Sequence, residues 1–204
     1  MMTLHWSPRS PYVRQVMIAA TELGLSGRIR TVRTLVGGTE PHLDLMRQNP
    51  LGKIPTLVLE DGGILYDSGV IVDYLDGLHA GRKLFPPGAD RLIALRRRAL
   101  GQGLIDIGLL WLGERSRPAA NQSPPHIELW RLKLHAAARA LEAEAADLAA
   151  ADFSVGHIAI GVALGYFDFR FPAEDWRENH PRLSDWHAAF NARPSVAANM
   201  PAEG

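Results

Sequence analysis

The chain has 204 residues, 47% of them hydrophobic and 22% charged, and its 22 basic and 22 acidic residues give a formal net charge of zero. This composition is typical of a globular protein and gives no reason to expect nucleic acid or an anionic membrane as a partner. The chain has no cysteine, which excludes disulfides, cysteine-based metal sites and a thiol nucleophile. It shows neither the apolar run of a signal peptide nor that of a membrane span, so we expect a cytoplasmic protein.

The first part of the chain combines strand and helix patterns. Alternating apolar residues predict four short strands, at Thr3–Trp6, Ile29–Leu35, Thr56–Leu59 and Ile64–Tyr66. Apolar residues at helical spacing predict helices at Pro11–Leu23, Leu43–Gln48 and Val70–Leu78. Gly24 would end the first helix, and Asp61-Gly62-Gly63 is a hairpin signal between the last two strands. The order βαβαββα predicts an α/β domain, a small mixed sheet with helices packed on it.

After Leu84–Gly88 the strand patterns stop. We therefore predict a first domain over residues 1–80, a linker over 81–88 and an all-α second domain over 89–204. The second domain is expected to hold four helices joined by loops, one of them the proline-rich Arg117–Pro125. The predicted helices are Ala89–Arg115, the alanine-rich Pro125–Ala151, the buried Ser154–Tyr166 and His180–Ala192.

The stretch SPRSPYVR, residues 7–14, places two Ser-Pro pairs near the start of the first helix. A serine cap followed by proline at the first helical position is a sufficient structural explanation. A capping serine nevertheless accepts a hydrogen bond and keeps its own hydroxyl proton. Beside the positive end of a helix dipole, such a donor is well placed to hold an anion, so both roles stay open for Ser7 and Ser10.

Three further segments extend this pattern: NPLGKIPTL (49–57), LYDSGVIVDYLD (65–76) and HPRLSDWHAAFNARPSV (180–196). Together with SPRSPYVR, in this order and spacing, they resemble the glutathione S-transferase superfamily, in particular bacterial serine- or cysteine-type members. The resemblance covers essentially the whole chain. It implies a thioredoxin-like N-terminal domain, an all-helical C-terminal domain, glutathione as co-substrate without a metal, and a homodimer.

The resemblance also implies site residues. Ser10 takes the position of the residue that stabilises the glutathione thiolate, with Ser7 as the alternative. Ile54-Pro55 matches the cis-proline whose preceding residue pairs through its backbone with glutathione; a strand-initiating proline is the structural alternative. Arg14 either adds positive potential or forms a surface or interdomain salt bridge.

Four more residues are implied in glutathione binding. Asp67 and Ser68 would hold the ammonium and carboxylate of the γ-glutamyl group, although helix capping alone explains either residue. Lys53, or less readily His42, would meet the glycyl carboxylate, with plain solvent exposure as the alternative for Lys53. The wall for the second substrate would lie between the domains and draw on the aromatic and apolar side chains of Tyr12, Ile107, Trp111 and Tyr166, with Trp6 and Phe169 as further candidates.

Two features depart from the family pattern. His157 stands where the family has the aspartate of a capping box, and we expect that histidine cannot accept as a carboxylate does. A role for His157 as a catalytic base is the alternative. The absence of cysteine disfavours thiol-disulfide chemistry. We therefore predict a glutathione transferase that conjugates glutathione to small hydrophobic electrophiles, as in detoxification. The alternatives are a glutathione-binding or scaffold protein without activity, and a glutathione-dependent peroxidase.

Overall fold

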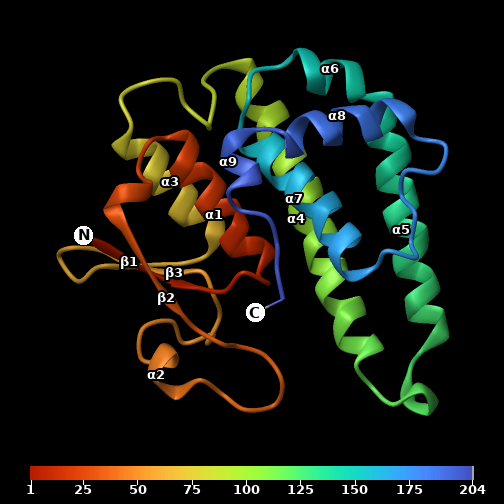
Figure 1. Cartoon of the computed structure of the whole chain (residues 1–204), viewed down its shortest axis with the longest axis horizontal. Helices are drawn as coiled ribbons and strands as arrows, with labels where there is room; N and C mark the ends of the chain where they lie inside the picture. The colour runs from red at the N-terminus through yellow and green to blue at the C-terminus, as the bar shows by residue number, and fades with distance from the viewer. Residues whose placement is uncertain (204) are drawn as a thin grey trace. The chain divides into compact units, whose positions relative to one another are not determined.

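The computed structural model describes residues 1–203, which divide by their contacts into two units. The first unit is Met1–Pro86 together with the segment that begins at Pro194, and the second is Pro87–Arg193. The last segment thus groups with the first unit, whereas the sequence boundaries placed it in the second domain. Figure 1 shows the elements of both units.

The first unit is built on a four-stranded sheet in the order β2-β1-β3-β4. Its strands are β1 (Met2–Trp6), β2 (Ile29–Arg33), β3 (Thr56–Val58) and β4 (Ile64–Leu65). β1 pairs parallel with β2 and antiparallel with β3, and β3 and β4 form the predicted antiparallel hairpin. The helices are α1 (Pro11–Glu22), α2 (Leu43–Met46), α3 (Ser68–Leu78) and α9 (Pro194–Ala197).

The core of the first unit lies where α1 and α3 pack together. Both helices bury one apolar face, and Val16, Ile18, Ile71 and Leu75 are almost fully buried there. α1 ends at Glu22, one residue before the predicted end, and Gly24 follows with the positive φ of 70° that suits glycine after a helix. The order βαβαββα is confirmed. The additional helix α9 was not predicted.

The second unit is helical throughout. It consists of α4 (Ala89–Arg115), α5 (Pro124–Ala143), α6 (Ala145–Ala150), α7 (Val155–Arg170) and α8 (Pro181–Asn191). α7 is the central helix, since every residue from Val155 to Phe167 is buried. α4 packs closely along it: a Cβ built on Gly101 would lie 2.4 Å from the backbone carbon of Ala159. The helical class predicted for this part of the chain is confirmed.

The alanine-rich helix is not continuous as predicted, because it breaks at Glu144 into α5 and α6. Glu144 has a ψ of 1°, outside the helical range, and its carboxylate is held by two arginines of α4. Arg96 donates to both oxygens, at 2.8 and 2.7 Å, and Arg97 Nε donates at 3.4 Å. Alanine favours a helix on either side of this point, so the tertiary ion pair decides where the helix turns.

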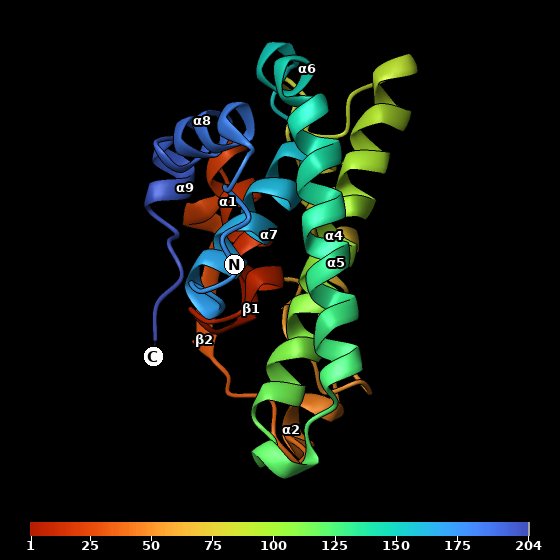
Figure 2. The same ribbon diagram turned by 90° about the vertical axis from the view of Figure 1, so that its right-hand side faces the viewer.

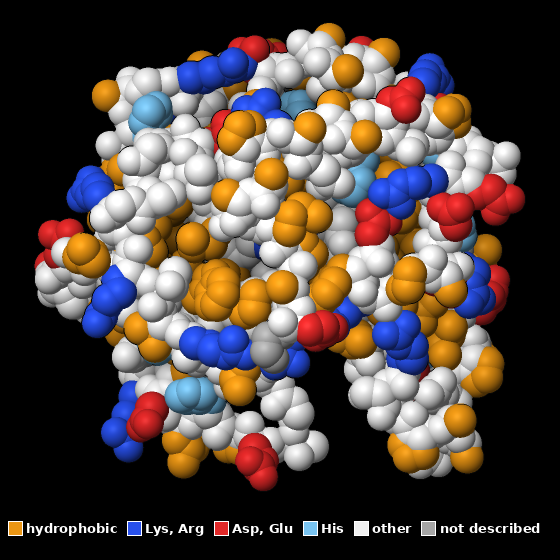
Figure 3. Space-filling model, viewed as in Figure 1, with side chains coloured by type: hydrophobic (Ala, Val, Ile, Leu, Met, Phe, Trp, Pro, Cys, Tyr) orange, Lys and Arg blue, Asp and Glu red, His pale blue; other side chains and the backbone are white. Residues whose placement is uncertain are grey.

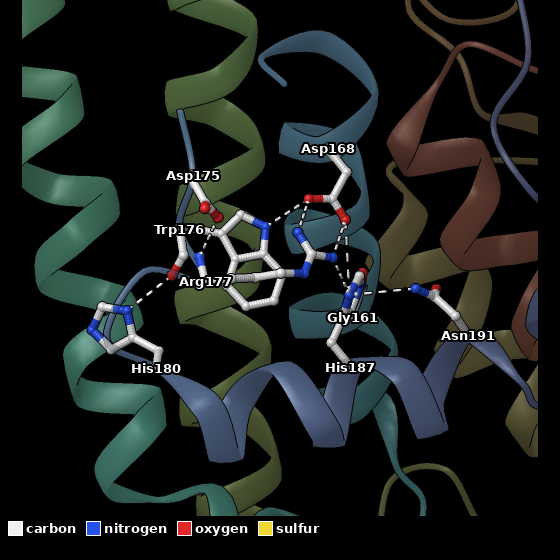
Figure 4. Close-up of polar contacts among 8 residues, drawn as sticks. All are labelled: Gly161, Asp168, Asp175, Trp176, Arg177, His180, His187 and Asn191. Carbon is white, nitrogen blue, oxygen red and sulfur yellow. Dashed lines mark hydrogen bonds and ion pairs between the residues drawn. The ribbon is translucent and has the colours of Figure 1, made fainter. Parts of the chain in front are cut away.

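A polar network joins α7, α8 and the loop between them, as Figure 4 shows. The Asp168 carboxylate accepts from Trp176 Nε1 at 2.8 Å and from both terminal nitrogens of Arg177, at 2.5 and 2.7 Å. The buried His187 lies beside Arg177, and its Nε2 contacts the Gly161 carbonyl at 3.1 Å. The carboxylate and the indole fix the loop residues against α7, which explains why α7 continues beyond the predicted end at Tyr166.

His157 forms the capping box that the sequence argued against. The ring Nδ1 accepts from the Ser154 N–H at 3.1 Å and contacts the Ser154 Oγ at 3.0 Å. The other nitrogen lies 3.0 Å from the Leu148 carbonyl, which can only accept, so the proton sits on Nε2 and Nδ1 keeps its lone pair. The expectation that histidine could not replace the carboxylate is therefore wrong, because this tautomer accepts in the same place.

In the described part of the chain, none of the helices combines the length and apolarity needed to cross a bilayer. The view in Figure 2 shows the long helices α4 and α5 along their length. On the face drawn in Figure 3, basic and acidic side chains are interspersed with hydrophobic ones. This mixture agrees with the zero net charge of the sequence.

Candidate functional site

The sheet topology brings three of the predicted segments to one edge. β1 runs toward this edge, β3 starts there because His5 pairs with Thr56, and β4 ends there because Leu65 pairs with Leu57. The segments that begin or end at this edge are residues 7–10 after β1, 53–55 before β3 and 67–68 after β4. The N-termini of α1 and α3 therefore point to the same place. We call this arrangement the sheet-edge site.

Ser10 caps α1 at the sheet-edge site. Its backbone is extended (φ −83°, ψ 117°), Pro11 follows at the first helical position, and Oγ accepts from the Val13 N–H at 3.3 Å. Ser10 is half-buried, whereas Ser7 is only 7% exposed and its Oγ accepts from the Arg9 N–H at 3.4 Å. The hydroxyl proton of Ser10 remains available to an anion at the helix N-terminus. Its greater exposure favours Ser10 over Ser7 for that role.

Ile54 lies beside a cis peptide bond, Ile54–Pro55, as the family resemblance implies. Within residues 1–203, the structure records no hydrogen bond to the backbone N–H or C=O of Ile54. These groups lie directly before β3, where an extended peptide can pair with them as a further strand would.

A buried asparagine that sequence reasoning missed shapes this loop. Asn49 is 1% exposed and donates to the Lys53 carbonyl and to Thr56 Oγ1, both at 3.0 Å. Thr56 Oγ1 in turn donates to the Lys53 carbonyl at 2.8 Å, and the Leu51 N–H donates to Asn49 Oδ1 at 3.1 Å. In the sequence, Asn49 stands out only as the first residue of the segment NPLGKIPTL. An asparagine before a short Gly-containing loop is also a signal for side-chain bonds to the backbone.

Asp67 and Ser68 open α3 and serve different purposes. Asp67 is exposed and is the cap, since its Oδ1 accepts from the Gly69 and Val70 N–H groups at 2.9 and 3.4 Å. Ser68 is 1% exposed, and no residue from 1 to 203 forms a hydrogen bond with its Oγ. A buried hydroxyl without a partner costs about 1–3 kcal/mol, so the capping role of Asp67 is filled while Ser68 retains an unused donor.

Lys53 lies in the segment before β3, and His42 lies at the start of α2. The Lys53 side chain is exposed, while its carbonyl is the acceptor that orders the loop. His42 is half-buried and caps the short α2, because its Nδ1 accepts from the Leu45 N–H at 3.1 Å. Capping therefore accounts for one His42 nitrogen. The long Lys53 side chain has more freedom to reach a ligand carboxylate.

The residues predicted for the second-substrate wall have packing roles in their own units. Trp111 is 3% exposed and packs on Phe171 and Phe167, with ring centroids 4.8 and 6.2 Å away. Tyr166 is also buried, and this burial raises the pKa of its phenol against the opposing effect of the Arg170 cation. Ile107, like Tyr12 in the first unit, is half-buried. Their contact with a substrate stays a prediction.

A recess in the second unit lies apart from the residues of the sheet-edge site. It has a volume of about 510 Å³ and is formed by the second unit alone, around α6, α8 and the start of α7. Its walls include the aromatic side chains of Phe153, His157, Trp186 and Phe190. His157 is already committed there to capping α7, so this recess offers less catalytic chemistry than the sheet-edge site. In the same described residues, no group of three or more His, Asp or Glu side chains is arranged to hold a metal ion.

Comparisons with known proteins find matches over most of the chain. The family model described as glutathione S-transferase, N-terminal domain, matches residues 4–83, and the C-terminal domain model of that family matches residues 124–189. The uncharacterized GST-like protein YibF of Escherichia coli K12 is 32% identical, with 98% of each chain covered.

Two solved structures extend the similarity to the whole fold. A glutathione transferase family member from Pseudomonas fluorescens Pf-5, solved with bound glutathione, has a TM-score of 0.95 and 39% identity, with 100% of each chain covered. A glutathione S-transferase from Methylobacillus flagellatus, also solved with glutathione bound, has a TM-score of 0.87 and 33% identity. The match covers 99% of this chain and 100% of the Methylobacillus chain.

Proposed function

Because the chain belongs to the glutathione S-transferase family, we propose that it binds glutathione at the sheet-edge site and activates its thiol for transfer. The observation that carries the proposal is the convergence of three unused polar groups at one edge of the sheet. These are the Ser10 hydroxyl proton, the Ile54 backbone and the buried Ser68 Oγ. The glutathione bound in relatives of 39% and 33% identity supports the same ligand here.

Each group has a counterpart on glutathione. The Ile54 N–H and C=O pair with the cysteinyl main chain, and Ser68 with the N-terminus of α3 holds the γ-glutamyl carboxylate. Asp67 uses one oxygen for capping and retains the other for the γ-glutamyl ammonium. Lys53, with His42 as the alternative, meets the glycyl carboxylate at the outer end of the tripeptide.

Ser10 then faces the sulfur. A free thiol has a pKa of about 8.5, so only a few per cent is thiolate at pH 7. Lowering that pKa by about two units requires roughly 2.7 kcal/mol of preferential stabilisation of the thiolate. One hydroxyl hydrogen bond to an anion contributes about 1.5–3 kcal/mol, and the α1 dipole adds about 0.3–1 kcal/mol. Together these contributions are large enough to lower the thiol pKa by about two units.

The transfer step needs no protein nucleophile. The thiolate sulfur forms a bond to an electrophilic carbon, and the displaced electron pair leaves with the leaving group or takes up a proton. Positioning the two reactants accounts for the acceleration. We propose small hydrophobic electrophiles as substrates, with Tyr12, Ile107, Trp111 and Tyr166 contributing apolar surface. We propose in addition that the protein is a cytoplasmic homodimer that acts in detoxification.

The test is a pH titration of bound glutathione, followed by thiolate ultraviolet absorbance in wild type, Ser10→Ala and Ser7→Ala. We expect a bound-thiol pKa well below the free value, restored toward it only in Ser10→Ala, with turnover reduced and affinity nearly unchanged. Asp67→Ala should instead weaken binding. A larger loss in Ser7→Ala would move the role to Ser7.

Other outcomes identify the alternatives. Glutathione binding with an unshifted pKa and no turnover would make the protein a glutathione-binding module, and no binding at all would make it a scaffold. Turnover of organic hydroperoxides without conjugation would make it a peroxidase.

A further inference from the structure

Arg14 lies one turn after Ser10 on α1, and its charged side chain is only 5% exposed. Its Nε donates to the Asn199 carbonyl at 2.9 Å, and its Nη2 lies 3.2 Å from Met200 Sδ. The Arg14 N–H donates to the Ser10 carbonyl at 3.0 Å. The partners shown are a main-chain oxygen and a thioether of the C-terminal segment, residues 199–202.

The C-terminal segment also contacts the chain before Ser10. The Ala202 N–H donates to the Pro8 carbonyl at 3.4 Å, and Pro8 lies in the turn closed by the Ser10 N–H donating to the Ser7 carbonyl at 3.2 Å. The segment is therefore bound on both sides of Ser10 in sequence, at Pro8 and at Arg14. Ser10 itself takes part in local hydrogen bonds: its carbonyl accepts from the Arg14 N–H at 3.0 Å and its Oγ accepts from the Val13 N–H at 3.3 Å.

α9 anchors the C-terminal segment to the far end of α1. Ser195 Oγ donates to the carboxylate of Glu22, the last residue of α1, and Ser195 is 3% exposed. The Asn199 side chain donates to the Ser195 carbonyl at 2.7 Å, which ties the segment back to α9. Figures 1 and 2 both place α9 beside α1. Contacts along the whole of α1 thus fix where residues 199–202 lie.

We propose that Arg14 and residues 199–202 form a clamp that positions Ser10 for its contact with the glutathione sulfur, with Arg14 as a positioning residue. The inference rests on the proposed function and adds a part of the chain that no sequence motif assigned to the site. A hydroxyl must be placed to within a fraction of an ångström to stabilise a thiolate, and small misplacements cost large factors in rate. The clamp adds a restraint from the C-terminal segment to the local hydrogen bonds of Ser10.

The test uses the full chain with three changes, each compared with wild type. Ala202→Pro removes the N–H that binds Pro8, Arg14→Met removes the guanidinium, and Arg14→Lys retains its charge. Arg33→Met, at an exposed position in β2, is the matched control. The readouts are the pKa of the bound glutathione thiol, and kcat and KM measured separately.

We expect Arg14→Met and Ala202→Pro to reduce kcat about tenfold and to move the thiol pKa toward its free value, with KM for glutathione little changed. Arg14→Lys should recover part of the loss, and Arg33→Met should match wild type. If the first two variants melt earlier but keep wild-type kcat and thiol pKa, the clamp is only structural and the inference fails.

Ser10→Ala in the same assay separates this inference from the proposed function. If Ser10→Ala shifts the thiol pKa and the clamp variants do not, only the clamp is wrong. If Ser10→Ala also has no effect, the proposed function fails first and the clamp fails with it.

Discussion

At the scale of single residues, capping and ligand binding do not exclude one another at the sheet-edge site. Ser10 accepts a capping hydrogen bond through Oγ and still has a proton to donate. At α3 the two tasks are divided between neighbours, since Asp67 takes the cap and Ser68 is left buried without a partner among residues 1–203. Capping of α3 by Asp67 therefore does not account for the buried Ser68 hydroxyl.

Ser68→Ala is therefore expected to act with opposite signs on stability and on binding. Removing an unpartnered buried hydroxyl relieves a desolvation cost of about 1–3 kcal/mol, so the melting temperature of the free protein should stay level or rise. Loss of the donor should weaken glutathione binding about tenfold. Calorimetry of the same samples gives the melting temperature, and titration with glutathione gives the affinity. A fall in melting temperature with unchanged affinity would show that Ser68 serves the fold alone.

At the scale of elements, the second unit depends on how closely α4 approaches α7. Gly101 allows this approach, because any side chain there would overlap the backbone of Ala159 and Ile160. Gly161 plays the same part toward α8, where a Cβ would lie 2.3 Å from the Phe190 ring.

Gly101→Ala should destabilise the protein by about 1–3 kcal/mol or more, since backbone atoms cannot move aside as a flexible side chain can. Gly103→Ala on the same helix is the control, because nothing lies within 4 Å of its Cβ position. There the better helix propensity of alanine should stabilise by up to about 1 kcal/mol. Urea unfolding of both variants measures the change in the free energy of unfolding. Equal changes in Gly101→Ala and Gly103→Ala would rule out the packing explanation.

At the scale of the whole molecule, carboxylates paired in the folded state set the response to acid. Hydrogen bonds from Arg96, with smaller contributions from Arg97, lower the pKa of Glu144 below its ordinary 4.5. The N-terminal ammonium lowers the pKa of Glu60 through a hydrogen bond. Burial acts to raise the pKa of Glu142, but the Leu183 N–H and Arg182 outweigh it and lower the pKa. All three groups make folding favour the ionised form.

These three carboxylates should therefore contribute fully to the free energy of unfolding above about pH 4.5, the ordinary pKa of the group. Their contribution should be lost as the pH falls through their lowered pKa values in the folded state. Glu144→Gln should be less stable than wild type at pH 7, and the difference should shrink as wild-type Glu144 becomes protonated. Urea unfolding at pH 7, 5, 4 and 3 measures this convergence. A difference that stays constant with pH would mean that the Glu144 charge contributes nothing.

Local patterns were sufficient for most of the fold, whereas the segments of the candidate site were indicated by the family resemblance and their roles stay predictions. The boundaries of α4 follow from its own periodicity, and the hairpin follows from Asp61-Gly62-Gly63. Features decided by distant partners were missed: the break at Glu144 depends on two arginines of another helix. The acceptor role of His157 depends on the Leu148 carbonyl fixing its tautomer. The unused hydroxyl of Ser68 was likewise invisible, because burial is a property of the packed unit.

The return of the chain to the first unit at Pro194 has a consequence for synthesis on the ribosome. The partners of Glu22 and Arg14 in α9 and the C-terminal segment emerge after the whole second unit has been made. During translation of residues 87–193, the side of α1 that contacts α9 therefore lacks its partner. The contacts that bury Arg14 cannot yet form. The burial of Arg14, and with it the completion of the first unit, therefore follows the synthesis of the second unit.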